Sequence, residues 1–254
     1  MFRPVALVIY ALKLVGAGLF FFTPFALIGI GFFFGPDLFV FYQIFSPRAR
    51  ILCDVRSRFR PVGKQIWLTI DDGPDPEDTP RILELLEQHR ARATFFVIGR
   101  RAQQHPELLA EIVRRGHELG CHTQTHPAGT FWSVGPRRVR REIDENLAFL
   151  RAAGAAPRWF RAPAGIKNLF LDRALRERRL ACIGWSIRSH DCFARNPEWI
   201  AARVMRQVRP GAIVLMHEGP SVSPAVRVNA IALVLQSLST AGFSCELPRP
   251  EQLV

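Results

Sequence analysis

The sequence predicts an α/β protein in which a mostly parallel sheet is closed or nearly closed into a barrel, preceded by an N-terminal hydrophobic membrane segment. Three observations indicate this class. Short apolar runs alternate with longer amphipathic runs from Gln65 onward, as βα units require. About seven such units follow one another, which favours a barrel over an open sheet. Apolar side chains dominate the chain before residue 47.

The N-terminal apolar segment is long enough to cross a bilayer. Leu14 to Phe34 contains no charge, and about 20 apolar residues suffice for a spanning helix. A cleavable signal peptide would have an apolar region of only about 7–15 residues and a small-residue cleavage site, which is absent here. The apolar character continues on both sides, with Pro24 and Gly35-Pro36 as breaks, so one helix, a hairpin and a re-entrant segment remain open. We expect residues 1–46 to form a membrane anchor.

A basic segment, residues 47–64, follows the anchor and is expected to be a linker to a catalytic domain over residues 65–254. Its positive residues are Arg48, Arg50, Arg56, Arg58, Arg60 and Lys64, whereas the N-terminal flank has only Arg3 and Lys13. Positive residues favour the cytoplasmic side. The sequence thus predicts a protein of the bacterial inner membrane whose catalytic domain lies on the cytoplasmic side.

Composition excludes two other classes of protein. The net charge of +12 comes almost entirely from arginine, and no nucleic-acid-binding motif accompanies it, so we expect no nucleic-acid partner. The five cysteines are widely spaced and odd in number, without a C-x-x-C pair. This pattern excludes a disulfide framework or a zinc knuckle and indicates reduced thiols, which fits a cytoplasmic domain.

Seven short apolar runs are expected to be strands. They are Ile66–Ile70, Thr94–Ile98, Glu118–Cys121, Trp159–Phe160, Ala181–Trp185, Ala212–Met216 and Phe243–Glu246. Amphipathic segments between them are expected to be helices, and three begin at a proline, which favours the first helical position. These helices are Arg81–His89, Glu107–Arg115, Arg137–Ala152, Leu171–Arg179, Glu198–Val208 and Ala225–Ala241.

Polar side chains suited to catalysis follow the predicted strands. They are Asp71, Asp72, His122, His126, Arg161, Trp185, Asp191 and His217. The loops at the carboxyl ends of parallel barrel strands form one face, where active sites are built. We therefore expect these side chains to lie together.

Each of these features also has an ordinary structural interpretation. An Asp-Asp-Gly-Pro turn is commonly only a polar loop, and two histidines four residues apart are weak evidence for a metal. Together, however, two histidines and one carboxylate bind a divalent metal while leaving positions open. His217 ends a buried strand and on its own would be a hydrogen-bonded core histidine.

In combination, these residues resemble the polysaccharide deacetylase family, carbohydrate esterase family 4 or NodB homology domain, whose five signature regions occur in order across residues 66–217. The resemblance implies a distorted (β/α)7 barrel and metal-dependent hydrolysis of an N-acyl group on an amino sugar. Two positions depart from the family pattern. Ala164 stands where many relatives have an aromatic residue, and Cys192 follows Asp191 where many have tryptophan.

The resemblance also implies roles for single residues. Asp72, His122 and His126 would bind the metal, commonly zinc, and Asp71 would be the general base. Arg161 would orient Asp71, and Asp191 would hold Arg161. His217 would protonate the leaving amine. The backbone N–H of Ala164 would stabilise the oxyanion, Leu215 would contact the acyl methyl, and Trp185 is expected to contact substrate.

Three functions follow as hypotheses. The first is a membrane-anchored N-deacylase that removes an acetyl or formyl group from a lipid-linked amino sugar or another glycan at the membrane. The second is a chitin or peptidoglycan N-deacetylase that faces the cell exterior. The third is an inactive glycan-binding membrane protein, which would be expected to have lost at least one of these residues. Hydrolysis of O-acetyl esters by the same residues also remains open.

Overall fold

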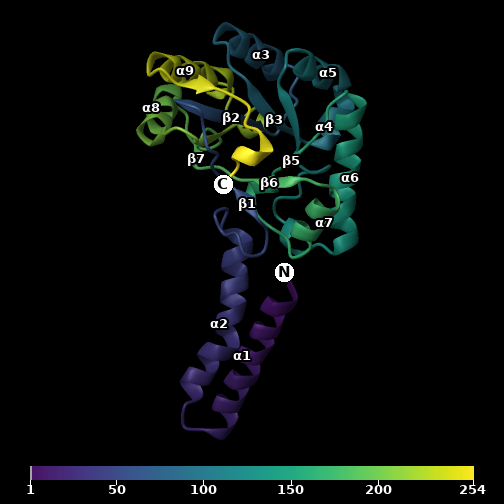
Figure 1. Cartoon of the computed structure of the whole chain (residues 1–254), viewed down its shortest axis with the longest axis vertical. Helices are drawn as coiled ribbons and strands as arrows, with labels where there is room; N and C mark the ends of the chain where they lie inside the picture. The colour runs from purple at the N-terminus through teal and green to yellow at the C-terminus, as the bar shows by residue number, and fades with distance from the viewer. Residues whose placement is uncertain (1) are drawn as a thin grey trace.

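The computed structural model describes residues 2–254, with side chains described from Val5 onward. Two long helices, α1 (Phe2–Phe22) and α2 (Ala26–Phe45), form an antiparallel hairpin that extends away from an α/β domain (Figure 1). The start of α1 and the α/β domain lie at the same end of this hairpin. Both helices are long and apolar enough to cross a bilayer, with mean hydropathies of 2.2 and 1.6. Of the arrangements that the sequence left open, the structure has the hairpin.

Small residues let the two helices approach closely near the turn of the hairpin. A Cβ atom on Gly16 would lie 2.7 Å from the carbonyl oxygen of Gly29, and one on Gly29 would lie 2.6 Å from the carbonyl oxygen of Gly16. Such contacts are typical of membrane helix pairs. Lys13 and Asp37 form an ion pair of 2.7 Å between the helices. Among the described residues, close backbone packing and the Lys13–Asp37 ion pair therefore hold the hairpin.

A parallel sheet of nine strands forms the centre of the α/β domain within the described residues. Its order is β1-β6-β5-β4-β3-β2-β8-β7, with β9 beside β2. The strands are β1 (Val55–Arg56), β2 (Gln65–Asp71), β3 (Ala93–Val97), β4 (Glu118–Cys121), β5 (Trp159–Phe160), β6 (Ala181–Ile183), β7 (Ile187–Arg188), β8 (Ile213–His217) and β9 (Ser244–Cys245). The sheet curls into an incomplete barrel with edges at β1 and β7. The predicted distorted (β/α)7 barrel is confirmed.

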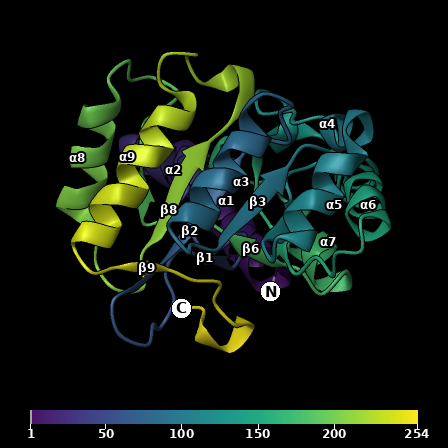
Figure 2. The same cartoon turned by 90° about the horizontal axis from the view of Figure 1, so that it is seen from above.

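Helices cover the outside of this sheet (Figure 2). They are α3 (Asp78–Gln88), α4 (Gly99–Gln104), α5 (Pro106–Arg114), α6 (Pro136–Ala152), α7 (Leu171–Glu177), α8 (Pro197–Gln207) and α9 (Arg227–Thr240). Proline at the first position starts α5, α6 and α8, and the Asn196 side chain caps α8 by accepting a hydrogen bond from the Trp199 N–H. Helix α3 begins at Asp78, three residues before the expected Arg81, because the Asp75 side chain accepts hydrogen bonds from the N–H groups of residues 77 and 78.

Alternating side chains give the sheet an inner and an outer apolar layer. Inside the barrel, Trp67 and Trp159 meet edge to face at 5.4 Å and pack with Phe96, Ile183 and Ile213. The outward-facing side chains pack against the helices as the main core. Because the inner apolar cluster fills the barrel below them, the polar side chains at the strand ends form a separate layer above it.

The seven predicted strands and six predicted helices all occur, with ends within about three residues of those expected. The short strands β1 and β7 and the short helix α4 were not predicted. Residues 47–64, expected to be a linker, are instead part of the α/β fold. Val55 pairs with Cys182, and Phe59 is buried and bridged to Leu253.

Candidate active site and metal centre

Asp71 ends strand β2, Asp72 follows it, and the two carboxylates have different partners. The extended backbone at Asp71 sends its side chain into the barrel beside Arg161, whereas Asp72 has a φ of 73° and faces the histidines. Positive φ is uncommon for residues other than glycine and persists only where surrounding structure enforces it. Five of the residues with positive φ lie in loops after strands: Asp72, Thr123, His126, Ala164 and His190.

His122 and His126 lie in the loop that follows β4, as predicted, and not on a helix. Two buried side chains of α6 hold this loop. Asn146 donates to the carbonyl oxygens of Val97 and Thr123 at 2.8 Å each. Glu142 accepts hydrogen bonds from the backbone N–H and the hydroxyl of Thr125 at 2.8 and 2.7 Å. Both histidines are therefore positioned by groups outside their own loop.

The three predicted metal ligands lie together. Asp72 Oδ1 is 3.5 Å from His122 Nε2 and 3.4 Å from His126 Nε2. Donor atoms that bind one ion at about 2.0–2.2 Å lie about 3–3.5 Å apart, so these separations fit a shared cation. Asp72 Oδ1 is also buried without a hydrogen-bond partner among the described residues, as expected of an atom reserved for a ligand.

The protonation states of these groups suit metal binding. Burial would raise the pKa of Asp72, but the adjacent His122 ring and the charges of the nearby histidines hold it well below its usual range. Burial, and then the neighbouring His122, lower the pKa of His126 to about 4. The site therefore presents a carboxylate and a neutral imidazole near pH 7, and the His122 Nδ1 atom lies 2.9 Å from the Arg161 carbonyl oxygen, which fixes the ring.

Arg161 is fully buried and is held by four hydrogen bonds. Its guanidinium donates to Asp71 Oδ1 at 2.6 Å, to Thr69 Oγ1 at 2.8 Å, and to the carbonyl oxygens of Ile183 and Gly184 at 3.2 and 2.9 Å. The predicted contact between Arg161 and Asp71 is thus present. The expected contact between Arg161 and Asp191 is not formed. The carbonyl oxygens of Ile183 and Gly184 accept hydrogen bonds from the guanidinium N–H groups that Asp191 was expected to bind.

Asp191 instead pairs with His217. Its carboxylate accepts hydrogen bonds from the His217 backbone N–H at 2.7 Å and from the ring Nδ1 at 2.8 Å. Burial alone would lower the pKa of His217, but the charge of Asp191 and this hydrogen bond raise it well above its ordinary value. His217 is consequently protonated at neutral pH, and its ring presents Nε2 to the site.

Comparisons with known proteins identify the family to which this fold belongs. The sequence profile of polysaccharide deacetylases matches residues 60–181. A chitooligosaccharide deacetylase from Bradyrhizobium sp. is 35% identical over 200 residues, which cover 74% of this chain and 90% of that protein. The chain belongs to the polysaccharide deacetylase family. A peptidoglycan-N-acetylglucosamine deacetylase from Bacillus cereus is 31% identical over 201 residues, covering 74% of this chain and 93% of that protein.

A solved structure of this family superposes with a TM-score of 0.67 at 31% identity, covering 74% of this chain and 67% of that chain. It is a variant, with restored enzymatic activity, of a CE4 family pseudoenzyme from Bacillus anthracis. The resemblance drawn from the sequence motifs is therefore confirmed. As a member of the polysaccharide deacetylase family, the chain is a carbohydrate N-deacetylase, a hydrolase of a C–N bond other than a peptide bond. The family is metal-dependent, and the Asp72, His122 and His126 donors fit a cation.

Three further residues were expected to contact the substrate or the oxyanion, namely Ala164, Trp185 and Leu215. Ala164 is exposed on a short helical turn with a φ of 53°. Trp185 covers the buried Arg161, whose guanidinium carbon lies 5.8 Å from the ring centroid. Leu215 is buried on β8, two residues before His217, and therefore points to the same face of the sheet.

Glu218 is a buried residue that the sequence reasoning missed. Its carboxyl group accepts a hydrogen bond from the Thr79 hydroxyl and packs against Gly73, where a Cβ atom would lie 1.7 Å from Oε1. Burial raises the pKa of Glu218 to about 8, so this side chain is neutral near pH 7. Its signal in the sequence was a charged residue directly after His217. Thr69, Glu142 and Asn146 were also missed, since polar residues within predicted elements carry no motif.

The apolar hairpin contacts two loops of this site. Phe41 and Phe45 of α2 pack against Trp132, in the loop after His126, with ring centroids 6.3 and 5.8 Å apart. Pro47 lies beside Gly165, in the loop after Arg161. The end of α2 is thus packed directly against the loops that carry catalytic-site residues.

Proposed function

We propose that the chain removes an N-acyl group, acetyl or formyl, from a lipid-linked amino sugar at the bacterial inner membrane, with zinc as cofactor. The observation that carries this proposal is the contact of the apolar hairpin with the site loops through Trp132 and Gly165. An enzyme for soluble glycans needs no such contact. Here, a membrane segment and the deacetylase site form one packed unit, which suits a substrate that is itself in the membrane.

In this proposal, Asp72, His122 and His126 hold the metal. When bound, a divalent metal polarises an acyl carbonyl and lowers the pKa of water. Two of the three donors are imidazole nitrogens and only one is a carboxylate oxygen. Such a set favours zinc over magnesium or calcium, which prefer oxygen ligands.

Asp71 acts as the general base that accepts the proton of the attacking water. Arg161 balances its negative charge within the barrel and fixes Oδ1 at 2.6 Å, which leaves Oδ2 to face the reacting water. Asp71 Oδ2 lies 3.8 Å from His122 Nε2, so the base and the metal ligands border the same small volume.

His217 acts as the general acid. Its raised pKa supplies a proton at neutral pH, and Asp191 fixes the ring so that Nε2 can deliver it to the leaving nitrogen. This step is needed because an amide anion is a poor leaving group. The Ala164 N–H stabilises the oxyanion, while Leu215 and Trp185 border the acyl group and the sugar.

The arrangement of charges supports a cytoplasmic domain. In a hairpin, both ends of the apolar segment lie on one side, and the basic residues of segment 47–64 are at that end. The turn at the far end, Thr23–Phe25, carries no charge. Positive residues favour the cytoplasmic side.

The relatives favour a second candidate. They are named chitooligosaccharide and peptidoglycan-N-acetylglucosamine deacetylases, so the chain could act on such a glycan with its domain facing outward. A C-terminal reporter distinguishes the two topologies. Activity of a cytoplasmic reporter supports the lipid-linked substrate, and activity of an exterior reporter supports the glycan.

The substrate itself is tested by mass spectrometry of membrane lipids and cell-wall glycans from cells with and without the protein. We expect a lipid-linked amino sugar that lacks one acyl group only when the wild-type protein is present, and not with Asp71→Asn. A change confined to cell-wall glycans would refute the lipid-linked substrate. Release of acetate from matched N-acetyl and O-acetyl sugars separates amide from ester hydrolysis.

A further inference from the structure

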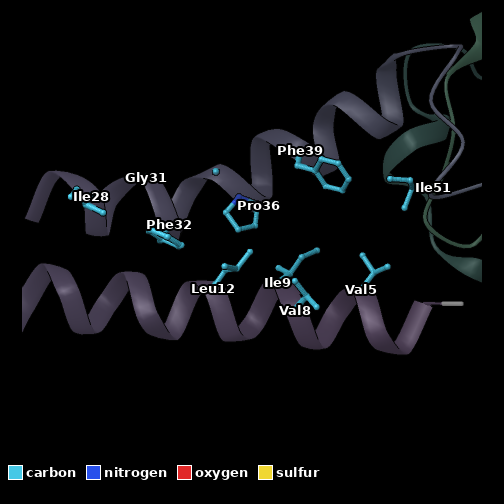
Figure 3. Close-up of a pocket in the computed structure, with 11 residues that line it drawn as sticks. Val5, Val8, Ile9, Leu12, Ile28, Gly31, Phe32, Pro36, Phe39 and Ile51 are labelled. Atoms are coloured by element: carbon cyan, nitrogen blue, oxygen red, sulfur yellow. The ribbon is translucent and has the colours of Figure 1, made fainter. Parts of the chain in front are cut away.

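The two hairpin helices separate toward the deacetylase domain and leave an apolar groove between them. Near the turn, Gly16 and Gly29 bring the backbones into contact. Pro36 lies within the continuous helix α2, and Figure 3 shows α2 moving away from α1 from that position onward. The resulting hairpin groove has a volume of about 820 Å³, within the range of about 300–1,000 Å³ that is usual for small-molecule sites.

The residues that line the hairpin groove are all apolar. It comes from Val5, Val8, Ile9 and Leu12 on α1, from residues of α2 that include Phe39, and from Ile51 beyond α2. Gly31 also lines it, and a Cβ atom there would meet nothing within 4 Å. Among the side chains that the structure describes, those lining the groove offer no hydrogen-bonding group to a sugar or a peptide. It does match a hydrocarbon chain.

The hairpin groove and the active site belong to one packed unit. Ile44 and Ser46, at the end of α2, accept hydrogen bonds from the backbone N–H and the ammonium group of Lys167, at 2.9 and 2.5 Å. Lys167 follows the loop of Ala164 and is buried. Ile51 lines the groove and bonds through its N–H to Gln43 of α2. A chain lying in the groove would therefore hold its head group at the deacetylase domain.

We propose that the hairpin groove binds the hydrocarbon chain of the lipid-linked amino sugar, so that the membrane segment is a substrate-binding element as well as an anchor. This inference rests on the proposed function. It commits to the substrate's own chain as occupant. Bulk membrane lipid and the helix of a second copy are the competing occupants that the test must separate.

The test uses the full-length protein in nanodiscs and two N-acetylglucosaminides, one with a hexadecyl and one with a methyl aglycone. The measured quantity is the ratio of their kcat/KM values. Gly31→Leu places an apolar side chain in the groove from a position where a Cβ atom meets nothing within 4 Å. We expect it to lower the preference for the hexadecyl substrate about tenfold, the usual effect of losing apolar contacts in a pocket. Gly31→Ala should lower it less. Gly18→Leu is the matched control, because a Cβ atom there also meets nothing within 4 Å, yet Gly18 does not line the groove; it should keep the wild-type ratio.

A second readout does not depend on turnover. A hexadecyl N-acetylglucosaminide with a diazirine on its chain should label residues 26–45 in wild type and in Gly18→Leu, but weakly in Gly31→Leu. Absence of this label, equal competition by phospholipid, or crosslinks joining two copies would each overturn the groove proposal. Labelling in the groove without hydrolysis of either glycoside would instead refute the proposed function and leave the groove as a lipid site.

Discussion

Asp191 binds His217 at two points, accepting from the backbone N–H with Oδ2 and from the ring Nδ1 with Oδ1 at 2.7 and 2.8 Å. Two contacts to one residue fix both the end of β8 and the orientation of the imidazole. The proton on Nδ1 is committed to Asp191, so only Nε2 can exchange a proton with a substrate. Asp191 is thus a positioning residue that acts through His217.

Replacing Asp191 with asparagine should change the pH dependence of turnover. The raised pKa of His217 keeps the acid form present until the pH rises through that pKa. Removing the negative charge lowers the pKa, so the acid form and the activity are lost at a lower pH. We expect the alkaline limb of the kcat profile to move down by at least about one pH unit, with kcat reduced about 10²-fold or more. Asp144→Asn, which removes a surface partner of Arg178, is the control. An unmoved alkaline limb would leave Asp191 with a purely structural role.

The two neighbouring aspartates should fail in different ways. Asp72→Asn removes a charged metal donor, and we expect dialysed protein to lose stoichiometric metal, measured by elemental mass spectrometry. Asp71→Asn keeps an oxygen for Arg161 and leaves all three donors, so it should retain the metal while kcat falls about 10²–10⁴-fold. Equal metal content in both variants would contradict this division of roles.

Glu218 should tolerate glutamine. Because burial raises its pKa to about 8, the folded state favours the neutral form over the unfolded chain, in which glutamate titrates near about 4.3. The stability contributed by the neutral carboxyl is complete below about pH 4.3 and is lost as pH rises toward 8. Glu218→Gln stays neutral, so we expect Tm to equal wild type at low pH and exceed it at pH 9.

The variant to compare with Glu218→Gln is Glu218→Ala, which removes the carboxyl group that packs against Gly73. Glu218→Ala should lower Tm at every pH by leaving a cavity. Should Glu218→Gln lose as much stability at pH 6 as Glu218→Ala, the side chain would have to be ionised in the folded protein.

The strand-end residues could be predicted because their position depends on a simple rule. Continuous apolar runs identify parallel strands, and whatever follows such a run lies at the carboxyl edge of the sheet. Asp72, His122 and His126 follow two different strands, yet their donor atoms lie within 4.8 Å of one another. The family resemblance then supplied an expected role for each.

Contacts that depend on irregular backbone could not be predicted in this way. Strand β7 has only two residues, and its pairing with β8 brings the Asp191 loop to His217 instead of Arg161. Strand β1 also has two residues, and its arginine-rich surroundings show no apolar run that would predict a strand. Glu142 and Asn146 are on a helix that is otherwise rich in exposed charged residues, so only their burial in the structure distinguishes them.

Arg161 should not be replaceable by lysine. The guanidinium joins strand β2, through Thr69 and Asp71, to the carbonyl oxygens of residues 183 and 184 at the end of β6. A lysine ammonium can neutralise Asp71 but cannot reach all four acceptors, so buried oxygens lose their partners. We expect Arg161→Lys to lower the free energy of unfolding by about 2–4 kcal/mol and to reduce kcat as Asp71 loses its fixed orientation. Arg178→Lys, at a pair with an exposed Asp144, should cost less than about 1 kcal/mol. Chemical denaturation measures both. The Asp71→Asn/Arg161→Lys double variant should lose less free energy of unfolding than the two single variants lose together, because the two side chains share one buried contact. Strictly additive losses would mean that Arg161 stabilises the end of β6 independently of Asp71.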